Sequence, residues 1–122
     1  ANLGPIPVHG ARAQFARNAV EAAGFEAVTN DGFETAEEAA ATFATSGAWA
    51  AVICSSDERY QSDAVATAQA LRAAGARRVA LAGRPGELEA SLVEAGTTDF
   101  LFLGADLLTL FEAWYATLTS QI

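Results

Sequence analysis

Few side chains in this sequence could ligate a metal or attack a substrate. His9 is the only histidine and Cys54 the only cysteine, which excludes an intrachain disulfide and a zinc cluster built from cysteines. His9 could act as a metal or cofactor ligand, or it could order the turn around it. Cys54 could act as a nucleophile, or it could pack as a small buried hydrophobic residue at the end of a strand.

Two further groups of residues have both a chemical and a structural interpretation. Ser55-Ser56-Asp57 could hold a ligand, and it would equally well cap the start of a helix. Gly83-Arg84-Pro85-Gly86 could offer a guanidinium to an anion, and it would equally well form a turn. Three large aromatic side chains are expected in the core or at an interface: Trp49, Trp114 and Tyr115.

Several well-known nucleotide and phosphate sites are missing from the sequence. It contains no G-x-G-x-x-G dinucleotide fingerprint and no G-x-x-x-x-G-K-[ST] phosphate loop. A response-regulator site needs an acidic residue after the third strand and a lysine after the fifth. Here the third strand ends in Cys54-Ser55-Ser56, and the chain has no lysine.

The elements that would position these residues alternate between two kinds. Short strand-like runs are predicted at 26–29, 49–54, 79–82 and 100–103, and the middle two are apolar on both faces. Helical spacing is predicted from Val8 to a closing Gly24, from Thr35 to Gly47, from Asp57 to Gly75, from Glu87 to Ala95 and from Asp106 to Leu118.

This alternation predicts an α/β fold with a doubly wound parallel sheet. Ala1-Asn2-Leu3 resembles the end of a first strand, which gives five strands in the flavodoxin-like order 2-1-3-4-5; half of a Rossmann fold is the alternative. Residues 1–122 then form a single domain. Because the chain has no methionine and opens at a strand end, we expect a C-terminal fragment of a longer chain with most of the first strand missing.

The overall charge argues against two classes of partner. Fifteen acidic residues outnumber seven basic ones, all arginine, and the formal net charge is −8. Binding to nucleic acid requires clustered positive charge, and so does binding to an anionic membrane surface, so neither is expected. A lone cysteine fits a reducing compartment such as the cytoplasm.

An ordered series of short motifs resembles one known family. It begins with Ala1-Asn2-Leu3-Gly4-Pro5 and His9-Gly10-Ala11-Arg12-Ala13, and it continues through Gly24-Phe25-Glu26-Ala27, Ser46-Gly47-Ala48, Cys54-Ser55-Ser56-Asp57 with Tyr60, Leu71-Arg72-Ala73-Ala74-Gly75-Ala76 and Leu81-Ala82-Gly83-Arg84-Pro85-Gly86. Together these resemble the C-terminal domain of the small (beta) subunit of methylmalonyl-CoA mutase, over nearly the whole chain.

The resemblance implies a fold of the cobalamin-binding-domain type. In working modules of that type, a D-x-H-x-x-G motif supplies the histidine below the cobalt, and S-x-L and G-G motifs follow. Here the motif falls on residues 7–12, so that His9 matches, whereas Pro7 replaces the aspartate and Arg12 the glycine.

The two later motifs also depart from the family pattern. Asp57 stands where S-x-L has leucine, and Arg84 follows Gly83 where the family has a second glycine. We therefore expect a vestigial site at His9, Ser55 and Gly83 that binds no cobalamin.

The function that the resemblance implies is non-catalytic. The domain would stabilise, or contact the large (alpha) subunit of, a heterodimeric isomerase that depends on adenosylcobalamin and interconverts methylmalonyl-CoA and succinyl-CoA. Trp114 or Tyr115 is a candidate contact residue. Two alternatives stay open: a working cobalamin carrier with His9 as the lower axial cobalt ligand, and a flavodoxin-like anion- or nucleotide-binding domain that uses Arg84 and helix N-termini.

Overall fold

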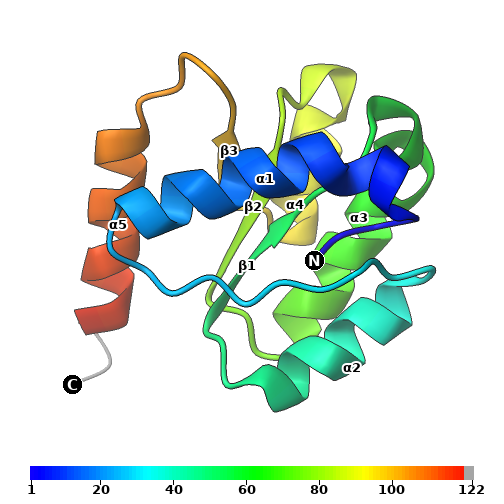
Figure 1. Ribbon diagram of the computed structural model, residues 1–122, viewed down its shortest axis with the longest axis horizontal. Helices are drawn as coiled ribbons and strands as arrows, with labels where there is room; N and C mark the ends of the chain where they lie inside the picture. The colour runs from blue at the N-terminus through cyan, green and yellow to red at the C-terminus, as the bar shows by residue number, and fades with distance from the viewer. Residues whose placement is uncertain (120–122) are drawn as a thin grey trace.

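The structure is a computed structural model that describes residues 1–119, and Figure 1 shows a short parallel sheet surrounded by helices. The strands are β1 (Ala50–Ile53), β2 (Arg78–Ala82) and β3 (Asp99–Leu101). The helices are α1 (Ile6–Ala22), α2 (Ala36–Ser46), α3 (Asp57–Ala73), α4 (Glu89–Ala95) and α5 (Leu107–Thr119), with a short 3₁₀ turn, η1 (Gly86–Leu88), before α4.

The sheet confirms the predicted α/β class and its parallel pairing. β1 pairs with β2 and β2 with β3, both in parallel, and Val52 lies opposite Ala80. The described residues thus form a sheet of three strands. Two isolated parallel bridges lie beyond β1, where Asn2 pairs with Cys54 and Leu3 pairs with Phe33.

The strand predicted at 26–29 is absent. Figure 1 shows this part of the chain running back as an extended segment from the end of α1 towards α2. Val28 is 66% exposed. β-structure needs a neighbouring strand to accept its backbone hydrogen bonds, and the first pairing that the segment makes is at Phe33. The strand prediction at 26–29 is therefore wrong, because no ladder forms there.

The predicted helices are present, with shifts at their ends. Thr35 caps α2 as expected, because its side chain accepts a hydrogen bond from the Glu38 N–H at 3.1 Å. Of the three residues Ser55-Ser56-Asp57 that could cap α3, the cap is Ser56, whose hydroxyl accepts from the Arg59 N–H. Asp57 is instead the first helical residue, where a carboxylate still suits the positive end of the helix dipole.

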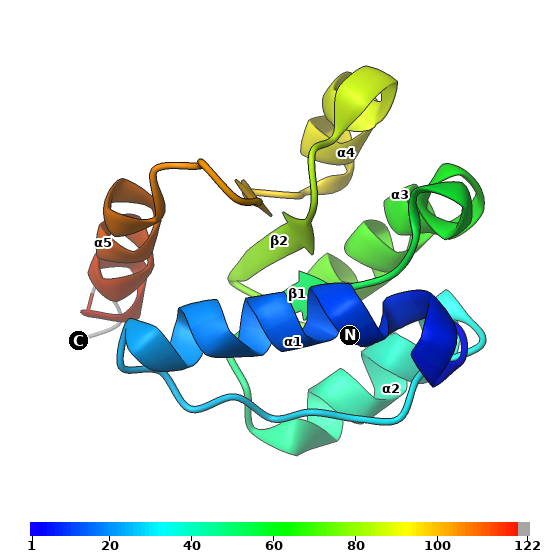
Figure 2. The same ribbon diagram turned by 45° about the horizontal axis from the view of Figure 1, so that its top comes forward.

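Two apolar clusters cover the two faces of the sheet. One joins Ala51, Ile53 and Leu81 of the strands to α3 and Leu92 of α4, with Phe43 of α2 packed against it. The other joins Cys54, Ala80 and Leu101 to α1 and α5. Figure 2 shows α3 and α4 separated from α1 and α5 by β1 and β2. This sandwich agrees with strands that are apolar on both sides.

The C-terminal helix places one of the two candidate contact residues in the core. Trp114 is only 3% exposed, and its indole N–H donates to a carboxylate oxygen of Asp99 at 2.8 Å. Its suggested role at an interface is therefore not available to it. Tyr115 is 43% exposed, stacks on Phe25 with ring centroids 4.5 Å apart, and donates to the Ala23 carbonyl oxygen.

Tyr60, in the first turn of α3, ties together the carboxyl ends of β1 and β2. Its hydroxyl accepts a hydrogen bond from the Ser55 N–H at 3.0 Å. The hydroxyl hydrogen is shared between the carbonyl oxygens of Ile53, at 3.1 Å, and Ala82, at 2.7 Å. Burial raises the pKa of this phenol well above its usual range, so it stays a neutral donor.

We expect Tyr60→Phe to lower the free energy of unfolding by about 1–3 kcal/mol, because it leaves a buried N–H and buried carbonyl oxygens without their partner. Urea unfolding measures the change. Tyr115→Phe is the matched control. It also removes one hydroxyl, but from a half-exposed side chain, and we expect a loss of about 1 kcal/mol or less. Equal losses in the two variants would contradict this role for Tyr60.

Candidate site at the carboxyl ends of the strands

The candidate site lies where ligands bind in open parallel sheets, beyond the carboxyl ends of the strands. The residues after β1 and β2 meet there, together with the start of α1. Of the three residues predicted to form the site, Ser55 and Gly83 lie at these strand ends, and His9 lies in the first turn of α1. Each of these three residues is engaged in contacts within the protein.

Arg12 reaches across this edge of the sheet from α1. Its guanidinium donates to the Ser55 carbonyl oxygen at 2.8 Å and to a carboxylate oxygen of Asp57 at 2.7 Å. The same group lies over the Tyr60 ring, 5.1 Å from the centroid. A side chain from the first helix therefore covers the end of β1.

Gly83 shows how closely Arg12 fits against β2. Its φ of +130° suits glycine, and a Cβ added there would lie only 3.1 Å from the guanidinium carbon of Arg12. The Gly83 N–H also donates to the Leu101 carbonyl oxygen at 2.6 Å. The space above this glycine is filled by Arg12, so the close approach of a ligand that a glycine would allow is blocked.

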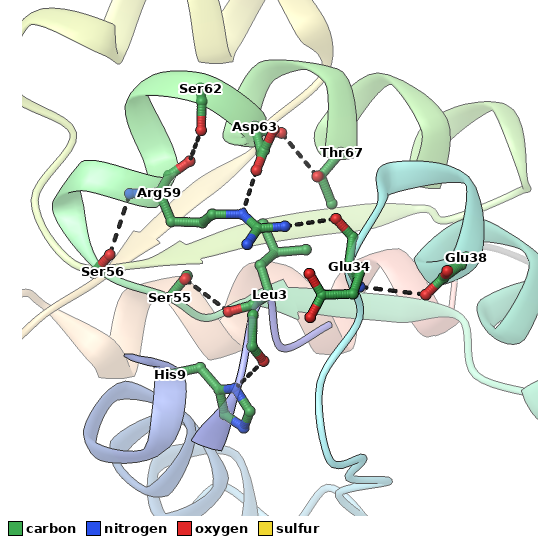
Figure 3. Close-up of polar contacts among 11 residues, drawn as sticks. Leu3, His9, Glu34, Glu38, Ser55, Ser56, Arg59, Ser62, Asp63 and Thr67 are labelled. Carbon is green, nitrogen blue, oxygen red and sulfur yellow. Dashed lines mark hydrogen bonds and ion pairs between the residues drawn. The ribbon is translucent and has the colours of Figure 1, made fainter. Parts of the chain in front are cut away.

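Ser55 is fully buried, and its polar groups are directed inward. Its hydroxyl donates to the Leu3 carbonyl oxygen at 2.8 Å, as Figure 3 shows. Its N–H donates to Tyr60 and its carbonyl oxygen accepts from Arg12. Ser55 therefore holds the start of the chain against β1, and these groups are committed within the fold.

His9 is only 3% exposed, so it is a buried residue of the first turn of α1. Its Nδ1 lies 2.9 Å from the Gly4 carbonyl oxygen (Figure 3), and because a carbonyl only accepts, Nδ1 carries the proton. In the neutral ring, Nε2 then keeps its lone pair. A Cβ on Gly32 would lie 3.0 Å from the imidazole carbon Cε1 and would overlap the Gly4 carbonyl oxygen, so Gly32 lets this loop close over the ring.

The remaining candidates do not form a reactive centre. Burial raises the pKa of the Cys54 thiol, which disfavours the thiolate that a nucleophile requires. Arg84 lies over the Phe102 ring at 4.3 Å from the centroid. Within residues 1–119, no group of three or more histidine, cysteine or acidic side chains is arranged to hold a metal ion. In the same range no helix has both the length and the apolar character needed to span a bilayer.

The sequence analysis missed the supporting roles of Arg59 and Tyr60. Figure 3 shows the Arg59 guanidinium between α3 and the loop before α2, where it pairs with Asp63 and donates to the Glu34 carbonyl oxygen. The i, i+4 spacing of Arg59 and Asp63 was a readable signal for the pair. No spacing in the sequence could show that Tyr60 reaches two strand ends.

Two sets of known proteins resemble the chain. It is 47% identical over 106 residues to the methylmalonyl-CoA mutase small subunit of Streptomyces virginiae, a match that covers 87% of the chain and 16% of that protein. It is 37% identical over 81 residues to probable methylmalonyl-CoA mutase small subunits of Mycobacterium bovis and Mycobacterium tuberculosis, over 66% of the chain and 13% of those proteins.

No protein-family profile matches the chain. The matched segments span only a small part of each relative, although they include most of the residues of this chain. The chain is therefore a homologue of methylmalonyl-CoA mutase small subunits and matches a segment of about one sixth or less of their length.

Proposed function

We propose that this chain is the C-terminal, non-catalytic domain of the small subunit of a heterodimeric, cytoplasmic methylmalonyl-CoA mutase. The isomerisation of methylmalonyl-CoA to succinyl-CoA, and the adenosylcobalamin it uses, would belong to the large subunit. The observation that carries the proposal is the Arg12 guanidinium, which fills the strand-end site between Ser55, Asp57 and Gly83.

The residues at this site do not fit a cobalamin. A corrin with its nucleotide tail would need the room beside α1 that Arg12 takes, and displacing Arg12 would break its ion pair with Asp57. Ser55 is buried and already bonded. The site is accordingly interpreted as vestigial at His9, Ser55 and Gly83, and no catalytic step is assigned to this domain.

The flavodoxin-like arrangement is part of the proposal. The two isolated bridges place Leu3 between Phe33 on one side and β1 on the other, because Asn2 pairs with Cys54 at the end of β1. If these bridges are the ends of two further strands, the order becomes 2-1-3-4-5, which is that of the cobalamin-binding-domain type. The hydrogen bonds from Leu3 to Cys54 and from Gly4 to Phe33, at 2.9 and 2.8 Å, support this reading.

One observation favours the second candidate, a working cobalamin carrier. Metal-binding histidines usually donate their other ring N–H to a carboxylate or a carbonyl, and His9 donates its Nδ1–H to the Gly4 carbonyl oxygen. It could take the place of the aspartate that Pro7 replaces. The ring is buried, however, so Nε2 could meet cobalt only after the first turn of α1 had moved.

We expect titration with hydroxocobalamin or adenosylcobalamin to leave the visible spectrum unchanged, because Arg12 and the burial of His9 close the site. Absorbance and co-elution on gel filtration measure binding at micromolar protein, and His9→Ala is the control. The unaltered chain and the variant should behave alike. A spectral shift that disappears in His9→Ala would support the carrier and contradict the vestigial site.

We expect Tyr115→Ala to weaken binding to a large mutase subunit, because Tyr115 is the candidate contact residue that remains partly exposed. A pull-down with immobilised large subunit measures the retained fraction. Val93→Ala on α4 is the matched control, since it trims an exposed apolar side chain on the opposite face of the sheet. Retention of Tyr115→Ala at the level of the unaltered chain would count against a contact there.

A further inference from the structure

The groove between α1 and α5 is a surface that the strand-end site does not use. Figure 1 and Figure 2 both show the C-terminal end of α1 meeting α5. Between the two helices lies a groove of about 310 Å³. Alanines at the end of α1 form one wall, and α5 forms the other with Leu108, Phe111, Glu112 and Tyr115. Glu112 is the only charged residue among those that line it.

The exposed part of the α5 wall is one stripe of the helix. Leu108, Glu112 and Tyr115 follow one another at steps of four and three, which places them on one face. Leu108 is 73% exposed and Tyr115 is half-exposed, whereas Phe111 is buried. The stripe therefore presents two large apolar side chains, about 10.5 Å apart along the helix, with a carboxylate between them.

The walls of the groove suit a helix better than an extended segment. Both walls are α-helices, whose backbone groups bond within the helix, so they offer no edge to which a strand could add. An extended segment would bury its own backbone groups there without partners, whereas a helix bonds them internally. The alanine wall also lets a helix approach closely, since the distance between packed helices depends on the side chains at the contact.

Glu112 sets the charge that an occupant must carry. The residue is exposed, and among residues 1–119 it has no hydrogen bond or ion pair. A helix that covers the apolar stripe would take this carboxylate out of water, which is costly unless an opposite charge faces it. The occupant therefore needs an arginine or lysine opposite Glu112, with apolar residues on either side.

A second copy of the chain does not meet this requirement. In a two-fold contact the same patch meets itself, so a contact centred on the stripe would bring the two Glu112 carboxylates together. Each copy also carries a formal net charge of −8. Because like charges oppose association, the groove is complementary to a partner with a basic face and not to itself.

We propose that the groove between α1 and α5 binds an amphipathic helix of the large subunit, with a basic side chain between two apolar ones on its contact face. Apolar residues seven positions apart on that helix would match Leu108 and Tyr115, and the arginine or lysine between them would pair with Glu112. This inference rests on the proposed function, because the large subunit is the partner, and it adds where the contact lies and which chemistry it uses.

The test measures the dissociation constant of the chain for a purified large mutase subunit by isothermal titration calorimetry. Glu112→Leu separates the proposal from a purely apolar contact, because it extends the apolar stripe and removes the carboxylate. We expect Glu112→Leu to raise the dissociation constant by about tenfold or more, since the cation of the partner loses its counter-charge, and Glu112→Arg to raise it further.

Glu94→Arg is the matched control, on α4 at the opposite face of the sheet. It makes the same change in net charge as Glu112→Arg, and we expect it to leave the dissociation constant within about twofold, because a distant exposed charge is screened by salt. Both positions are exposed on helices, so the variants should keep the fold, which circular dichroism checks.

The outcomes separate this inference from the proposed function. Failure of the unaltered chain to bind the large subunit would overturn both. Binding that Glu112→Leu leaves unchanged or tightens would overturn only the basic helix in the groove. Equal weakening by Glu112→Arg and Glu94→Arg would also overturn it, since net charge alone would explain the effect. So would a dimer of the unaltered chain on gel filtration that Leu108→Arg abolishes, because a second copy would then fill the groove.

Discussion

The carboxyl ends of β1 and β2 present backbone groups that must find partners once helices cover both faces of the sheet, and two side chains provide them. The Tyr60 hydroxyl bonds to Ser55, Ile53 and Ala82, and the Arg12 guanidinium bonds to the Ser55 carbonyl oxygen and pairs with Asp57. Buried polar groups are costly when left without a partner, so this network stabilises the loops that end the strands. The same network occupies the place where a ligand would bind.

Much of the fold could be predicted from the sequence. The apolar runs at β1 and β2 and the glycines that close helices are local signals, and local signals predicted every helix to within a few residues. The prediction of a strand at 26–29 was wrong because a strand cannot be predicted from local sequence alone. Its backbone hydrogen bonds need a neighbouring strand, and the described chain places none beside it.

The candidate site was predicted only in outline. The departures at Pro7 and Arg12 were visible as residue types, and the structure places the Arg12 guanidinium carbon 3.1 Å from where a Cβ on Gly83 would lie. The burial of His9 and its bond to Gly4 were not visible, because they depend on how the first turn of α1 and the loop at Gly32 close together. Tyr60 was recognised as a motif residue, but its role needs the three-dimensional meeting of two strand ends.

Two features of this domain lie at different parts of one sheet. The strand-end site is filled by its own side chains, whereas the helices over one face, α1 and α5, leave an apolar groove between them. The central claim concerns the first, and an amide NMR titration with adenosylcobalamin tests it most directly. If Arg12 closes the site, the Ser55 and Gly83 amide signals stay in place as cofactor is added. Saturable shifts of both signals would show that Arg12 yields to the ligand and would contradict the account.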